Sequence, residues 1–165
     1  MRMLLSLGLV FCVAYSDIGL ADELSKEQFE RLFYEPQTVG RLGIYAERFR
    51  SLGARKQKAL LEARATLMGF FAATQALDQD PREFLGGPLA SKFKNRAQVG
   101  EALFGLETEL LVASVIDFEL PEQDSLELKY YVVVFSEGTM LLRQGQSRLK
   151  RVGASWKVVR IGGIE

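Results

Sequence analysis

The hydrophobic pattern of this 165-residue chain changes period near residue 107, from a helical to a strand-like spacing. Upstream, apolar residues recur every three or four positions, most regularly over 55–77, which predicts a long amphipathic helix. Downstream, short turn signals separate four runs rich in Val, Ile, Leu and Tyr, at 110–120, 126–136, 139–152 and 155–164. Connections this short make neighbouring strands antiparallel. The pattern therefore predicts an α+β fold, with N-terminal helices packed on a four-strand antiparallel C-terminal meander.

Local signals add detail to this outline. Gly145 falls inside the third run and predicts a bulge or bend that curls the sheet. Asp80, followed by proline, and Asn95 are helix-capping residues that each open a short helix. A capping box starting at Ser25 and the helical spacing over 38–52 predict two further helices near the N-terminus.

The N-terminus has the three parts of a cleavable secretory signal over residues 1–21. Arg2 supplies the positive charge, 3–16 is apolar and uncharged, and Gly19-Leu20-Ala21 offers a small-residue cleavage site. An apolar stretch this short does not span a membrane core about 30 Å thick, so we expect no permanent membrane anchor. The alternative is a buried N-terminal helix or strand.

Export would place the mature protein in the periplasm or outside the cell. We expect residues 22–165 to form a single domain, with a helical extension over 22–54 and a core over 55–164. The extension is rich in aromatic residues, and its helices over 25–52 would either cap the open end of the core or mediate a homodimer.

The residue types that most often carry chemistry are scarce. Cys12 is the single cysteine and would leave with the signal, and Phe11 before it is too bulky for a lipoprotein signal. The remaining chain then has no thiol and no disulfide, and the whole sequence has no histidine to act as a base or metal ligand. We therefore expect no metal site and no cofactor.

The charges balance overall but are segregated along the chain. There are 21 basic and 21 acidic residues, and the isoelectric point is about 6.4. This balance, and basic clusters without interleaved aromatic residues, argue against nucleic-acid binding. Residues 101–127 hold eight acidic residues and no basic one. They would either pair with basic strands inside the sheet or form an acidic rim that attracts a basic partner.

Several segments together resemble the nuclear-transport-factor-2-like, or SnoaL-like, superfamily over about 55–164. They are LMGFFAATQALD at the end of the long helix, DPREF and NRAQVGEALF in the short helices, and SWKVVRIGGI in the last strand. The resemblance implies a curled, cone-like sheet that wraps the long helix around a cavity, used in the family as an enzyme pocket, ligand site or partner surface. The catalytic histidine of family dehydratases is missing here, and the family's acidic residue before the first strand has no clear counterpart.

Polar residues on the inward face of such a cone would be the ligand-binding residues. Strand alternation puts Tyr130 on the apolar face of the second run and Trp156, Val158 and Arg160 on one face of the last run. Both faces are expected to line the cavity, with Arg143 as a further candidate. Tyr130 could donate a hydrogen bond, and the arginines could pair with a carboxylate or phosphate. Alternatively, Tyr130 is a core aromatic residue and Arg160 emerges at the sheet edge.

Three functions remain open from the sequence. The first is a non-catalytic binding domain whose cone holds a small apolar or anionic ligand or docks an envelope protein. The second is a cofactor-free isomerase or lyase that uses Asp117 and Tyr130, although the neighbours of Asp117 in its strand turn it toward solvent. The third is an assembly subunit of a cell-envelope complex.

Overall fold

The computed structural model describes residues 22–24, 47–76, 78–105, 108–122 and 124–162. The predicted signal over 1–21 and the helix predicted from Ser25 lie outside the described residues, as does most of the helix predicted over 38–52. Of that last helix, residues 47–50 are described and are helical.

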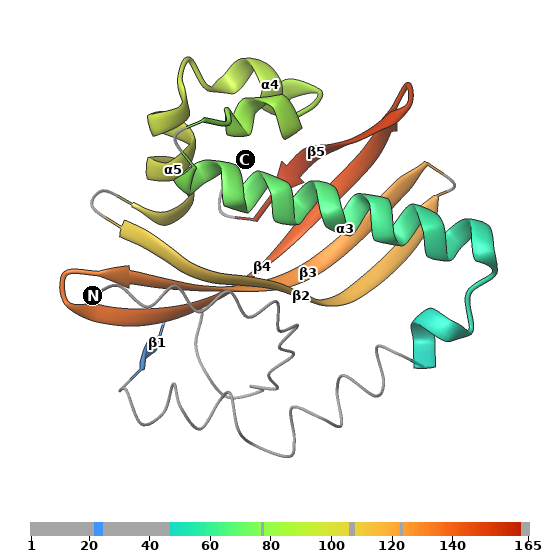
Figure 1. Cartoon of the computed structure of the whole chain (residues 1–165), viewed down its shortest axis with the longest axis horizontal. Helices are drawn as coiled ribbons and strands as arrows, with labels where there is room; N and C mark the ends of the chain where they lie inside the picture. Colours follow the sequence, from blue (N-terminus) through green and yellow to red (C-terminus); the bar gives the residue numbers. More distant parts are fainter. Residues whose placement is uncertain (1–21, 25–46, 77, 106–107, 123, 163–165) are drawn as a thin grey trace.

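Five strands form one antiparallel sheet (Figure 1). They are β1 (Asp22–Leu24), β2 (Thr108–Glu122), β3 (Ser125–Ser136), β4 (Thr139–Val152) and β5 (Ser155–Ile161). Strands β2 to β5 pair in sequence order as antiparallel neighbours, which confirms the predicted α+β fold and its meander. The sheet is curled and is not closed into a barrel.

The short strand β1 was not predicted. It pairs with the first part of β4, where Asp22 lies opposite Leu142, while β5 pairs with the second part of the same strand. The helices predicted for the extension over 22–54 begin at Ser25, and this strand lies before that position.

Bulges interrupt the pairing and add twist to the strands that carry them. The β2–β3 ladder shifts register between Leu110 and Val112 and again between Val115 and Asp117. The β4–β5 ladder shifts at Arg148. Each shift reverses the alternation of side chains beyond it, so these positions decide which residues face the core.

Gly145 is not one of these bulges, so of the predicted bulge or bend the bulge is wrong. It lies directly opposite Tyr130 in a β3–β4 ladder that runs without a register shift. A β-carbon at Gly145 would overlap the ring and hydroxyl of Tyr130. Glycine stands here because another side chain packs against its backbone.

Helix α3 (Ala54–Gln75) lies across one face of the sheet, which we call the inner face (Figure 1). Its buried side chains have the predicted spacing and include Leu60, Ala63, Leu67, Phe70 and Thr74. Residues of β2 to β5 pack against them in one core. Burying this stripe is what holds a 22-residue helix on the sheet.

Three short helices follow α3: the 3₁₀ helix η1 (Pro81–Phe84), α4 (Pro88–Lys92) and α5 (Arg96–Phe104). Asp80 and Asn95 cap η1 and α5 as predicted, accepting backbone N–H bonds of 2.9 and 3.0 Å. Helix α4 was not predicted. It begins at Pro88, directly after Gly87, which has a φ of 57°. The Gly-Pro pair that ends the preceding helical segment therefore also begins α4, because proline is favoured at the first position of a helix.

Candidate functional site at the open end of the sheet

The interior of the curled sheet is filled by aromatic side chains. Tyr130, predicted to face a cavity, is only 4% exposed. Its ring meets that of Phe71 edge-on with centroids 5.0 Å apart, and Phe70 packs beside Phe71 at 5.5 Å. Burial raises the pKa of Tyr130 to about 12. Tyr130 is a core residue, as the alternative interpretation held.

Arg143 binds the C-terminal end of helix α5. Its Nη1 donates a hydrogen bond of 3.0 Å to the carbonyl of Phe104, the last residue of α5. The last carbonyls of a helix have no partner within it, and they carry the negative end of its dipole. The guanidinium therefore fixes α5 to the sheet.

Arg160 lies on the outer face of the sheet, away from α3. The register shift in the β4–β5 ladder puts Arg160 opposite Arg148, whose guanidinium bonds to Glu127 on that face. Val158, by contrast, stays in the core. The prediction that Arg160 shares a face with Trp156 and Val158 is therefore wrong, because the bulge reverses the alternation between them.

Asp117 anchors the segment before α3 to the edge of the sheet. Its carboxylate pairs with Arg48 and lies 3.6 Å from the Lys129 ammonium. Arg48 also donates to the Phe118 carbonyl at 2.8 Å, and its guanidinium lies 4.6 Å from the centre of the Phe118 ring. Asp117 is opposite Lys129 on the outer face, whereas Tyr130 faces the core. The structure does not bring Asp117 and Tyr130 together.

These contacts also locate part of the acidic segment. Glu119 lies 3.0 Å from the Lys129 ammonium and is the main reason that the pKa of Lys129 is raised. Glu127 accepts a bond of 2.7 Å from Arg148. At these positions acidic residues of the 101–127 segment pair with basic groups of neighbouring strands. This is the pairing inside the sheet that was one of the two arrangements expected for the segment.

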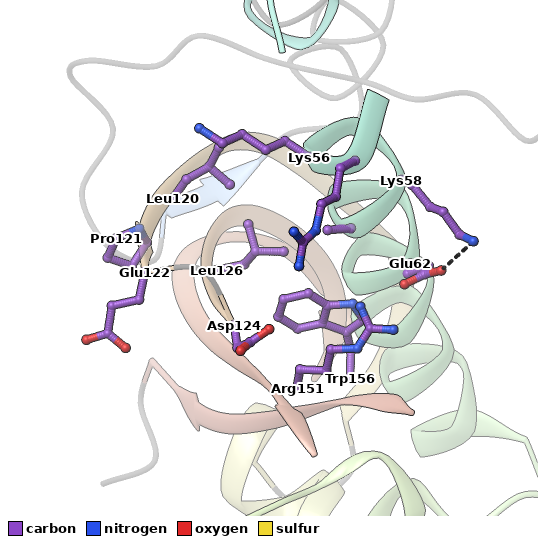
Figure 2. Close-up of a pocket in the computed structure, with 12 residues that line it drawn as sticks. Lys56, Lys58, Glu62, Leu120, Pro121, Glu122, Asp124, Leu126, Arg151 and Trp156 are labelled. Carbon is purple, nitrogen blue, oxygen red and sulfur yellow. Dashed lines mark ion pairs between the residues drawn. The ribbon is translucent and has the colours of Figure 1, made fainter. Parts of the chain in front are cut away.

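Trp156, another of the predicted ligand-binding residues, lines a cavity. The cavity has a volume of about 630 Å³ and lies where α3 begins, beside the β2–β3 and β4–β5 connections (Figure 2). We call it the mouth pocket. It is lined by Arg55, Lys56, Lys58, Ala59, Glu62, Leu120, Pro121, Glu122, Asp124, Leu126, Arg151 and Trp156.

The floor of the mouth pocket is apolar and belongs to the main core. Trp156 and Leu126 are 4% and 2% exposed and belong to the main core, against which Ala59 and Leu120 also pack. Figure 2 shows the indole ring in the centre of the pocket, with the Arg151 side chain next to it. The indole Nε1 is buried and has no hydrogen-bond partner among the described residues.

The rim of the pocket is mainly basic at the start of α3. The helix begins after Gly53, which has no side chain to cap it, and its first turn holds no acidic residue. Arg55 and Lys56 stand there instead, and Arg151 also lines the pocket. Positive side chains at this end of a helix are unfavourable, because the helix dipole is positive there too.

Sequence reasoning missed Arg55, Lys56 and Arg151 as candidate site residues. The signal that could have found them is the run Arg55-Lys56-Gln57-Lys58 directly after a glycine that opens an amphipathic helix. It contradicts the usual preference for acidic residues in a first turn. Arg151 carries no such signal, because only folding brings it to the same pocket.

No protein-family model, curated protein or solved structure matches this chain. In the part of the chain that the structure describes, no cluster of acidic, histidine or cysteine side chains is arranged to hold a metal ion. No helix within those same residues is both long and apolar enough to cross a membrane.

Proposed function

We propose that this protein is a binding domain that holds a small molecule with an apolar body in the mouth pocket. The observation that carries the proposal is the apolar floor of Trp156 and Leu126 at the base of a cavity of about 630 Å³. Cavities of this size with apolar walls and a few polar groups are typical small-molecule sites.

The placement of the pocket supports a binding role at the end of the sheet instead of in its centre. Tyr130, Phe70 and Phe71 occupy the centre. The mouth pocket lies at the opposite end of α3 from α5 (Figure 1). The resemblance to cone-shaped domains and the predicted export signal fit an exported ligand-binding protein, and both belong to this proposal.

A neutral apolar fluorophore, N-phenyl-1-naphthylamine, tests the proposal. Trp156 is the only tryptophan of the chain, so energy transfer from tryptophan to the bound dye reports on this pocket. We expect saturable binding with energy transfer. The substitution Ala59→Phe, which places a ring in the pocket, should weaken dye binding about tenfold, equivalent to about 1.4 kcal/mol.

The matched control is Ala65→Phe, an identical change at an exposed position of the same helix that does not line the pocket. This variant should bind the dye as the parent does. Absence of dye binding to the parent protein, or equal binding by both variants, would contradict the proposed function.

A further inference from the structure

The start of α3 combines features that are costly for folding. The first turn has no acidic residue, and Arg55 and Lys56 add positive charge at the positive end of the helix dipole. Natural sequences break such local rules mainly at functional sites. An anion bound at this position would turn these unfavourable charges into favourable ones.

The other side of the mouth pocket points to the same ligand chemistry. Arg151 reaches the pocket from the end of β4, where it is paired with Trp156 of β5 (Figure 2). Trp156 is only 4% exposed. Its indole Nε1 donor has no hydrogen-bond partner among the described residues. A buried donor without an acceptor costs free energy, and an oxygen of a ligand in this pocket would satisfy it.

The acidic residues of the pocket do not cancel its preference for an anionic ligand. Glu62 lies 4.0 Å from the Lys58 ammonium and is thereby engaged. Figure 2 shows the Glu122 carboxylate turned away from the pocket centre, whereas the Asp124 carboxylate lies near the indole. Asp124 is therefore the one acidic group expected to oppose an anion at the centre.

We propose that the ligand of the mouth pocket is an anionic amphiphile, whose carboxylate or phosphate group binds Arg55, Lys56 and Arg151 while its apolar body lies on Trp156. This inference rests on the proposed function and adds the chemical class of the ligand. The apolar part of the lining, which includes the partly exposed Ala59, Leu120 and Pro121, favours a ligand with an apolar body over a compact inorganic anion.

Three probes with the same twelve-carbon chain separate the head-group chemistry: laurate, dodecanol and dodecyltrimethylammonium, each below its aggregation concentration. Binding is followed by the emission of Trp156. We expect laurate to bind about tenfold or more tightly than dodecanol, and the cationic probe to bind weakest. Lauryl phosphate, added as a fourth probe, distinguishes a phosphate from a carboxylate preference.

Substitutions then assign the head group to its residues. Arg55→Gln and Arg151→Gln should each weaken laurate binding about three- to tenfold and leave dodecanol binding unchanged. Asp124→Asn should strengthen laurate binding. Lys94→Gln removes the same charge from an exposed residue that does not line the pocket, and it should change nothing.

Lys56→Glu separates a role of Lys56 in ligand binding from a role in helix stability. A glutamate in the first turn suits the helix dipole, so the melting temperature of the ligand-free protein should rise by about 1–3 °C. Laurate affinity should fall at least tenfold in the same variant. A higher melting temperature with unchanged laurate affinity would overturn the inference.

The failures of the two proposals are distinguishable. Equal binding of laurate and dodecanol, or a tryptophan signal that does not respond to laurate, overturns the anionic class while neutral dye binding still supports the pocket. Loss of laurate binding in Lys94→Gln to the same extent as in Arg55→Gln would show non-specific charge attraction and would also overturn it.

Discussion

Tyr130 and Gly145 are a matched pair on neighbouring strands. The phenol occupies the space that a side chain at position 145 would fill, and the two residues are directly opposite in the β3–β4 ladder. Tyr130 is only 4% exposed, so its phenol lies within the core. The stability of this part of the core therefore depends on the pair and not on either residue alone.

The substitution Gly145→Ala should lower the free energy of unfolding by about 1–3 kcal/mol, because the new methyl group overlaps the Tyr130 ring. Urea unfolding of a double-mutant cycle with Tyr130→Leu measures the coupling. With the ring removed, the cost of Gly145→Ala should fall below about 1 kcal/mol. An equal cost in both backgrounds would show that backbone conformation, not contact with Tyr130, requires glycine here.

The phenol of Tyr130 should make the protein sensitive to alkaline pH. Its pKa is about 12 in the folded state against 10.0 for the unperturbed group. Since the folded value is the higher one, this contribution to stability is complete below pH 10 and is lost as the pH rises toward 12. By about pH 11 the loss should reach roughly 1 kcal/mol.

Urea unfolding at about pH 8 and about pH 11 checks this expectation, with Tyr130→Phe as the reference. The parent protein should lose roughly 1 kcal/mol more than the variant over this interval. If both proteins lose the same amount, another group governs the alkaline response.

At the scale of elements, local periodicity predicts most of the framework. The strand runs expected at 126–136 and 139–152 match β3 and β4, and the caps at Asp80 and Asn95 begin η1 and α5. These features depend on residues close together in the sequence. Burial of one face gives strands their alternation, and capping side chains bond to backbone groups two or three positions away.

The predictions that failed depend on how strands are paired. Alternation alone put Arg160 beside Val158, and the β4–β5 bulge reverses it. Gly145 was expected to form a bulge or a bend, but no bulge forms there, and its lack of a side chain makes room for the Tyr130 ring across the ladder. A single sequence shows that a strand contains a glycine or an arginine, but the partner strand determines what that residue does.

For the whole molecule, the candidate site lies at the end of the curled sheet and not in its centre. Of the residues predicted to bind a ligand, Trp156 lines the mouth pocket, whereas Tyr130 is buried with Phe71 and Arg143 holds the end of α5. Arg151 and the start of α3 come together there only through the tertiary fold. The basic run at the helix start is visible in the sequence, but the apolar floor beneath it is not.

The most direct test is a two-dimensional ¹H–¹⁵N NMR titration of the protein with laurate. The single tryptophan gives one indole N–H signal, which belongs to Trp156 in the mouth pocket. We predict that this signal and the backbone amides of Arg55, Lys56 and Arg151 shift together and saturate. A second hollow, at the other end of α3 beside Thr74 and Arg96, provides an internal comparison. Shifts confined to that hollow, with the Trp156 indole unchanged, would contradict the account.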